Sequence, residues 1–219
     1  MKRNCSLDEI SDGKLYGLND MVKLGCNGCE GCSACCRGMG ASILLDPYDI
    51  FQLSLNLNTS FQALLEERQV IELNVVEGLI LPNIKLTGAL EQCPFLNEQG
   101  RCSIHAFRPG FCRLFPLGRY YEDGGFHYIL QIHECTKENK TKIKIRKWIG
   151  YPNMSSYDRY VNEWHYFLLD MGNSLTEEKK KAFNLYLLNT FFINIYDTNV
   201  DFFTQFAARL EEARRILLA

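Results

Sequence analysis

The sequence predicts an α+β fold, in which a small cysteine-organised domain of short helices and β-hairpins is followed by a C-terminal helical part. Residues 26–135 are rich in turn residues and contain nine of the 10 cysteines. From about residue 155 the chain has neither cysteine nor proline and shows helical periodicity. We therefore expect a lead-in at 1–25, a cysteine-cluster domain at 26–150, and a helical region at 151–219 packed on that domain.

Local signals predict the helices and hairpins of the first half. Asp46-Pro47 marks a helix start, because aspartate is a favoured N-cap and proline suits the first helical position. The capping-box pattern of residues 59–62 predicts a second short helix. Residues 69–86 are rich in Val, Ile and Leu around a Glu-Gly pair, which predicts a β-hairpin. The turn residues at 122–125 predict another hairpin.

Three helices are expected in the C-terminal region. Ser155 and Ser174 each begin an S-x-x-[DE] pattern, which predicts two helix starts. Asp201 precedes apolar residues in helical register and predicts the start of the third helix. The many aromatic side chains of this region are interpreted as its core.

A basic segment lies between the cysteine region and these helices. Residues 137–147 carry six basic residues and one glutamate, which is compatible with docking of nucleic acid or an acidic partner. Lys142 and Lys144 alternate with Ile143 and Ile145, however, and this pattern is typical of an edge strand protected by lysines. The edge strand is the favoured interpretation.

Charge and hydropathy argue against several classes of protein. With 24 basic and 26 acidic residues the net charge is -2, which disfavours a globally basic nucleic-acid or membrane binder. Asp8, Glu9 and Asp12 lie where a secretory signal would be apolar. The stretch Phe183–Tyr196 is interrupted by asparagines and falls short of the roughly 20 apolar residues of a membrane span. We expect a cytoplasmic protein, in which thiols stay reduced.

The densest chemical signal is the run Cys29-x2-Cys32-x2-Cys35-Cys36. Spacings of two let a tight loop present several sulfurs to one centre, as in zinc sites and ferredoxins. Thiolates are soft ligands that suit zinc, copper(I) or iron–sulfur clusters. Adjacent side chains point in different directions, so Cys35 and Cys36 are expected to serve different centres.

A second group of cysteines lies beside turns farther along the chain: Cys93, Cys102, Cys112 and Cys135. Together with the first run they make eight thiols, enough for two four-sulfur sites. Two cysteines are left over. Cys5 is interpreted as a small buried hydrophobe. Cys26 is in register with the x2 spacing, and its role is left open.

The order of these motifs resembles the YkgJ-type cysteine-cluster family, which is described as zinc- or iron-chelating. The resemblance covers about residues 26–135 and rests on C-x2-C-x2-CC, Cys93-Pro94-Phe95-Leu96, Cys102-Ser103-Ile104, Arg108-Pro109-x2-Cys112-Arg113-x-Phe115-Pro116-Leu117 and Cys135. Ser33 replaces a usual glycine, and His105 replaces a usual aromatic residue. The resemblance implies a metal-binding domain whose ligands are Cys29, Cys32, Cys35, Cys36, Cys93, Cys102, Cys112 and Cys135.

Some members of that family are named flagellin lysine N-methylases, which implies methyl transfer from S-adenosylmethionine to a lysine of a protein partner. The residues themselves do not carry this chemistry. Cys32 and Cys36 have the first gap of a C-x3-C-x2-C triad, but Met39 stands at the third position. No G-x-G-x-x-G follows a predicted strand. Whether the protein is an enzyme, and its oligomeric state, are left open.

The identity of the metal is argued from the pattern around the cysteines. A cysteine triplet with a vicinal cysteine and neighbouring prolines favours an iron–sulfur cluster over zinc. Arg108 and Arg113 flank Cys112, and cations beside sulfurs stabilise thiolates and anionic clusters. His105 and His133 are interpreted as structural. The two alternatives to an iron–sulfur protein are the methylase and a zinc-stapled protein-interaction module.

Overall fold

We describe the chain from a computed structural model, which defines residues 6–217 except 27, 28, 30 and 31. It divides into two compact units. The cysteine unit contains Met1–Ile43 and Lys85–Met154, and the helical unit contains Leu44–Ile84 and Ser155–Ala219. The elements are helices and two-stranded antiparallel sheets, so the predicted α+β class with C-terminal helices is confirmed.

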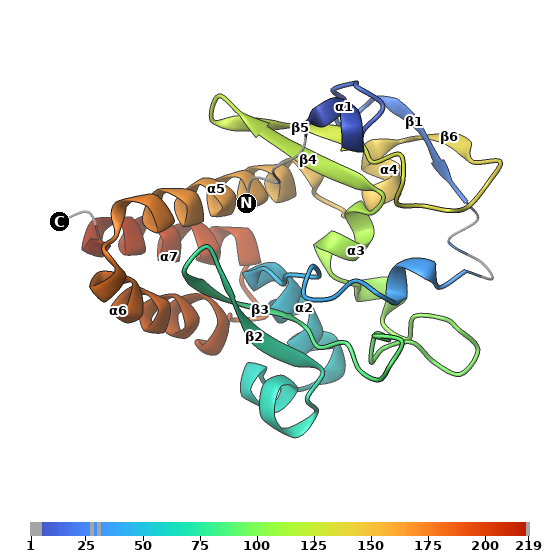
Figure 1. Ribbon diagram of the computed structural model, residues 1–219. Coiled ribbons are helices and arrows are strands. Elements are labelled where there is room, and N and C mark those ends of the chain that lie inside the picture. Colours follow the sequence, from blue (N-terminus) through green and yellow to red (C-terminus); the bar gives the residue numbers. More distant parts are fainter. Residues whose placement is uncertain (1–5, 27–28, 30–31, 218–219) are drawn as a thin grey trace. The chain divides into compact units, whose positions relative to one another are not determined.

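The cysteine unit consists of short elements joined by turns (Figure 1). Its helices, of which η2 and η4 are 3-10 turns, are α1 (Leu7–Ile10), η2 (Ala34–Cys36), η4 (His105–Phe107), α3 (Gly110–Leu114) and α4 (Ile145–Ile149). Its strands are β1 (Met21–Gly25), β4 (Leu117–Glu122), β5 (Gly125–Leu130) and β6 (Thr141–Lys144).

Strands β1 and β6 pair antiparallel into a two-stranded ribbon. Val22 and Leu24 are 3% and 1% exposed, whereas the residues that alternate with them face solvent. The predicted edge strand is therefore present, although it ends at Lys144 because helix α4 begins at Ile145. Its partner β1 comes from the segment that the sequence predicts to be a polar lead-in.

Hairpin β4–β5 confirms the prediction at residues 122–125. Asp123 and Gly124 have φ values of 48° and 77°, as a two-residue type I′ turn requires. Tyr16 extends this hairpin, because its backbone exchanges hydrogen bonds of 2.8 and 2.9 Å with Tyr128. The N-terminal segment thus runs along β5 before it enters the ribbon.

The helical unit combines one hairpin with longer helices (Figure 1). Its strands are β2 (Ile71–Val76) and β3 (Leu79–Ile84). Its helices, of which η3 and η5 are π-helical, are α2 (Pro47–Leu57), η3 (Ala63–Glu67), α5 (Met154–Ser174), α6 (Glu177–Leu188), η5 (Asn189–Ile193) and α7 (Phe202–Leu217).

The predicted start of helix α2 is confirmed in detail. The Asp46 carboxylate accepts a 2.9 Å hydrogen bond from the backbone N–H of Asp49, and Pro47 occupies the first turn. Hairpin β2–β3 is also confirmed, and Asn184 of α6 joins it to the helices. The Asn184 side chain accepts from the Ile80 N–H at 2.8 Å and donates to the Gly78 carbonyl at 3.0 Å.

An aromatic core joins the C-terminal helices, as predicted. Phe191, Phe167 and Phe206 are each at most 1% exposed. The Trp164 ring lies 5.1 Å from Phe191 and 5.9 Å from Phe206 between ring centroids. These contacts pack α5 and α7 against the π-helical turn η5. Tertiary packing of aromatic side chains, more than intrinsic helix propensity, therefore stabilises α5, η5 and α7.

Helix α6 is capped by Thr176, whereas the sequence predicts a start at Ser174. The Thr176 hydroxyl accepts from the Lys179 N–H at 3.5 Å, whereas the Ser174 hydroxyl donates to the Asp170 carbonyl at the end of α5. We predict that Thr176→Ala lowers the free energy of unfolding by about 1 kcal/mol, since an orphan helix N–H loses its acceptor. Ser174→Ala, measured alongside in urea, should cost less; the reverse order would contradict the assignment.

The described helices and the grouping of residues 44–84 bear on the membrane and domain predictions. Among the described residues, no helix combines the length and the apolar character needed to cross a membrane. The predicted domain boundaries at residues 25/26 and 150/151 stay a prediction. Residues 44–84, which the sequence predicts to belong to the cysteine domain, group with the C-terminal helices.

Candidate metal centre

The first cysteine segment begins where strand β1 ends. The Sγ atoms of Cys26 and Cys29 lie 3.6 Å apart, and the Cys29 N–H donates to the Cys26 carbonyl at 3.2 Å. The Cys32 N–H in turn donates to the Cys29 carbonyl at 3.0 Å. Cys29 has a φ of 62°, which is unusual for a residue with a side chain. Backbone hydrogen bonds therefore link Cys26 to Cys29 and Cys29 to Cys32.

The segment continues into the 3-10 helix η2, which carries Cys35 and Cys36. The Cys36 N–H donates to the Ser33 carbonyl at 3.0 Å and closes this turn. The Cys36 carbonyl accepts a 2.9 Å hydrogen bond from the N–H of Cys93. This bond joins two cysteines that are 57 positions apart in the sequence, as the predicted convergence of the two segments requires.

Arg101 makes a second connection between the segments. Its Nη1 donates to the Cys29 carbonyl at 2.8 Å. Arg101 lies in a tight loop that the Leu96–Cys102 bridge closes, and the Ser103 N–H donates to the Phe95 carbonyl at 2.8 Å within it. The loop therefore holds Cys102 beside the first cysteine segment.

The thiols of both segments share one electrostatic environment. Burial raises the pKa of Cys29 to about 12 and also raises the pKa values of Cys93 and Cys102. A hydrogen bond with Cys36, followed by burial, raises the pKa of Cys35 far above its usual range. Negative charge on Cys35 raises the pKa of each of the other three. Metal binding must displace these protons, so metal affinity falls as pH falls.

The guanidinium of Arg108 opposes this accumulation of thiols, and Arg101 adds to its effect at Cys102. The positive charge of Arg108 lowers the pKa values of Cys29, Cys35 and Cys102, although burial and neighbouring thiols outweigh it. Its Nη1 is hydrogen-bonded to Nε2 of His105. Its Nε is buried and has no hydrogen-bond partner among the described residues. Arg108 thus offers a spare N–H donor in the region of the sulfurs.

His105 and Arg113 both make contacts with Arg108. Burial, followed by the charge of Arg108, lowers the pKa of His105, whose ring is already engaged by that arginine. Arg113 donates to the carbonyls of Ala106, Arg108 and Ile149. Its guanidinium also lies 4.5 Å from the Tyr151 ring centroid. Arg113 therefore holds the backbone around Cys112.

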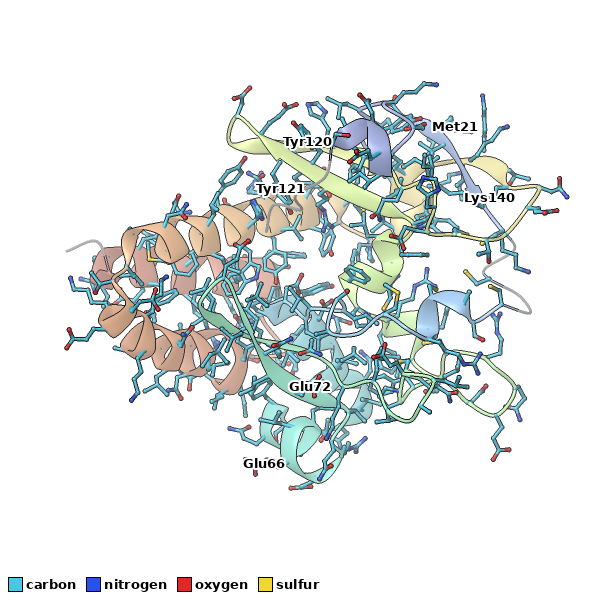
Figure 2. All side chains as sticks on the ribbon, in the orientation of Figure 1. Met21, Glu66, Glu72, Tyr120, Tyr121 and Lys140 are labelled. Atoms are coloured by element: carbon cyan, nitrogen blue, oxygen red, sulfur yellow. The ribbon has the colours of Figure 1, made fainter. Side chains whose placement is uncertain are left out.

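Cys112 and Cys135 lie on other elements of the cysteine unit. Cys112 lies on α3, two residues into that helix. Cys135 lies between β5 and β6, and its carbonyl accepts a 3.0 Å hydrogen bond from Nζ of Lys140. Lys140 is labelled in Figure 2. Cys5 lies outside the described residues. The nine described cysteines are all free thiols.

The described contacts bring six thiols from two distant segments into one region: Cys26, Cys29, Cys35, Cys36, Cys93 and Cys102. They do not bring three or more Cys, His, Asp or Glu side chains of the described chain to coordination distance of one point. The ligand assignment of the eight cysteines stays a prediction. Cys26 belongs to this group although it is absent from the predicted ligands, and its x2 spacing from Cys29 is the signal that could have included it.

The region is thiol-rich, and thiolates are soft ligands that suit zinc and iron. Residues 28–147, more than half of the chain, match the family model described as "CxxCxxCC: putative zinc- or iron-chelating domain", and the chain belongs to this family. No curated protein and no solved structure gave a significant match. The relation to flagellin lysine N-methylases and the use of S-adenosylmethionine stay predictions from the resemblance.

Proposed function

We propose that this protein is a cytosolic iron–sulfur protein, in which thiolates of both cysteine segments hold the cluster. The observation that carries the proposal is the meeting of the two cysteine segments, where the Cys93 N–H bonds to the Cys36 carbonyl and Arg101 bonds to the Cys29 carbonyl. The charge of Arg108 lowers the pKa values of Cys29, Cys35 and Cys102 in this region. A soft donor set of this kind suits iron–sulfur clusters and zinc, not magnesium or calcium.

The number of thiols favours a cluster over one zinc ion. A structural zinc ion takes four ligands, whereas the region where the two segments meet contains six cysteines. A cluster held by four thiolates carries excess negative charge, which Arg108 is placed to offset. The free Nε–H of Arg108 fits the same role, because hydrogen bonds to sulfur stabilise the reduced form of such a cluster.

The bound cluster would supply one-electron chemistry, for redox transfer, sensing or modification of a partner. The chain's own contribution is to hold the sulfurs and shape their surroundings. Arg101 fixes the Cys29 backbone, and the backbone hydrogen bond from Cys93 to Cys36 holds the two cysteine segments together. Half-burial of the thiols limits contact with water.

Purification without oxygen tests the proposal. We expect brown protein containing iron and acid-labile sulfide in equal amounts, with absorption that bleaches when dithionite is added. A colourless protein that carries zinc and no sulfide after expression in iron-supplemented medium would contradict it.

One observation favours zinc as the second candidate. Sulfur atoms on a tetrahedral ion with metal–sulfur bonds of about 2.3 Å are about 3.8 Å apart. The separation of 3.6 Å between Cys26 and Cys29 is close to this value. A zinc-stapled interaction module would give the colourless, sulfide-free result described above.

A further inference from the structure

We propose that Cys26 is a metal ligand that chelates together with Cys29 in the metal centre proposed above. The inference rests on metal binding by this centre and holds for zinc or for iron. It extends the metal site by one residue beyond the C-x2-C-x2-CC run. Cys26 also lies two residues before the segment that matches the family model, residues 28–147.

The two sulfurs already occupy neighbouring positions. Their separation of 3.6 Å is close to the edge of a tetrahedral thiolate site, about 3.8 Å for metal–sulfur bonds of about 2.3 Å. It is too long for a disulfide bond, which is about 2.05 Å. Both residues are partly exposed, so an ion can reach them from solvent. This geometry lets one ion bind both sulfurs with little movement of the chain.

Strand β1 delivers Cys26 to this position. Cys26 follows Gly25 directly, and Gly25 pairs with Thr141 of β6. A Cβ atom on Gly25 would lie 2.2 Å from Oγ1 of Thr141, so only glycine permits this close approach without a shift. The buried side chains of Val22 and Leu24 hold the strand against the cysteine unit. The position of Cys26 therefore follows from tertiary pairing.

Cys29 is held independently from the other side. Arg101 binds its carbonyl at 2.8 Å, which supports a backbone conformation that costs free energy on its own. The Cys29 N–H also donates to the Cys26 carbonyl at 3.2 Å, so a local turn brings the two residues together, and the contacts of Gly25 and Arg101 hold the turn at its two ends. The buried Nε of Arg108, without a partner in the described chain, points to a ligand of negative charge in the same region.

Zinc retention by the intact chain tests the assignment. Zinc-loaded wild type and Cys26→Ser are challenged with chelators of graded strength, and cobalt(II)-loaded samples give the intensity of the thiolate-to-metal absorption. We expect Cys26→Ser to bind zinc at least about tenfold more weakly and to lose one thiolate's share of that absorption. Cys5→Ser serves as the matched control and should behave like wild type.

A second pair of variants covers the case in which Cys26→Ser is insoluble. Gly25→Ala should displace Cys26 and weaken zinc retention, and Thr141→Ala in the same chain should restore it by removing the clashing hydroxyl. Unchanged zinc retention and cobalt absorption in Cys26→Ser would overturn the assignment. So would failure of Thr141→Ala to restore zinc retention in Gly25→Ala. Wild type that binds neither zinc nor iron would instead overturn the proposed function.

Discussion

Cys35→Ser is expected to abolish metal binding and to leave the cysteine unit largely unfolded. Cys35 is a predicted ligand whose charge raises the pKa values of Cys29, Cys93 and Cys102, so its loss removes one thiolate from the shared donor set. Metal binding to a structural site contributes on the order of 10 kcal/mol to folding. Since whole domains are stable by about 5–15 kcal/mol, that loss is comparable to the entire stability of the unit.

The soluble fraction and the metal content per chain measure this effect. We expect most of the Cys35→Ser protein in the insoluble fraction, and the soluble remainder without metal. Cys5→Ser, which removes a cysteine outside the predicted ligands, should leave yield and metal content unchanged. Soluble Cys35→Ser protein with a full complement of metal would show that Cys35 is not a ligand.

Phe191→Ala is expected to give the largest loss of stability in the helical unit, about 3–5 kcal/mol. Phe191 is fully buried, and its ring lies 5.1, 5.8 and 5.7 Å from those of Trp164, Phe167 and Phe206. Truncation leaves a cavity between helices that cannot close without moving all of them. Urea unfolding followed by far-UV circular dichroism gives the difference in unfolding free energy.

Ile195 provides the matched control for this substitution. It lies four residues further along the chain and is 85% exposed, so Ile195→Ala removes a comparable apolar side chain from solvent rather than from the core. Its cost should stay within about 0.5 kcal/mol. Equal costs for the two substitutions would mean that the aromatic cluster does not form the core of this unit.

Elements with strong local signals could be predicted from the sequence. Both hairpins follow from turn residues that tolerate positive φ, such as Asp123 and Gly124. Helix α2 follows from Asp46 and Pro47, and α7 begins after Asp201, whose carboxylate accepts from the Thr204 N–H at 2.9 Å. In each case neighbouring residues determine the conformation.

Features that depend on distant residues could not be predicted. Strand β1 is short, and it becomes a strand only because β6, more than 100 positions later, pairs with it. The cap of α6 is a local exception, because the Ser174 hydroxyl donates to the Asp170 carbonyl within α5 and Thr176 caps α6 instead. The contact of Arg101 with Cys29 likewise joins residues 72 positions apart, and no local pattern indicates it.

The same distinction applies to the candidate metal centre. The x2 spacings indicate that one loop presents several sulfurs, and they could be recognised without a structure. The grouping of Cys102 with Cys35 and the placement of Arg108 arise from tertiary contacts. Cys26 falls between these cases. Its spacing and the turn hydrogen bond to Cys29 are local, whereas strand β1, which leads into it, forms only by pairing with β6.

Differential alkylation of the thiols most directly tests whether two distant segments hold the same metal. The metal-loaded protein and a chelator-treated sample are labelled briefly under anaerobic conditions, and each cysteine is quantified by mass spectrometry. We predict that Cys29 and Cys35 are protected by metal together with Cys93 and Cys102, and that all four become reactive at the same chelator concentration. Protection of the first two alone, with Cys93 and Cys102 equally reactive in both samples, would contradict the account.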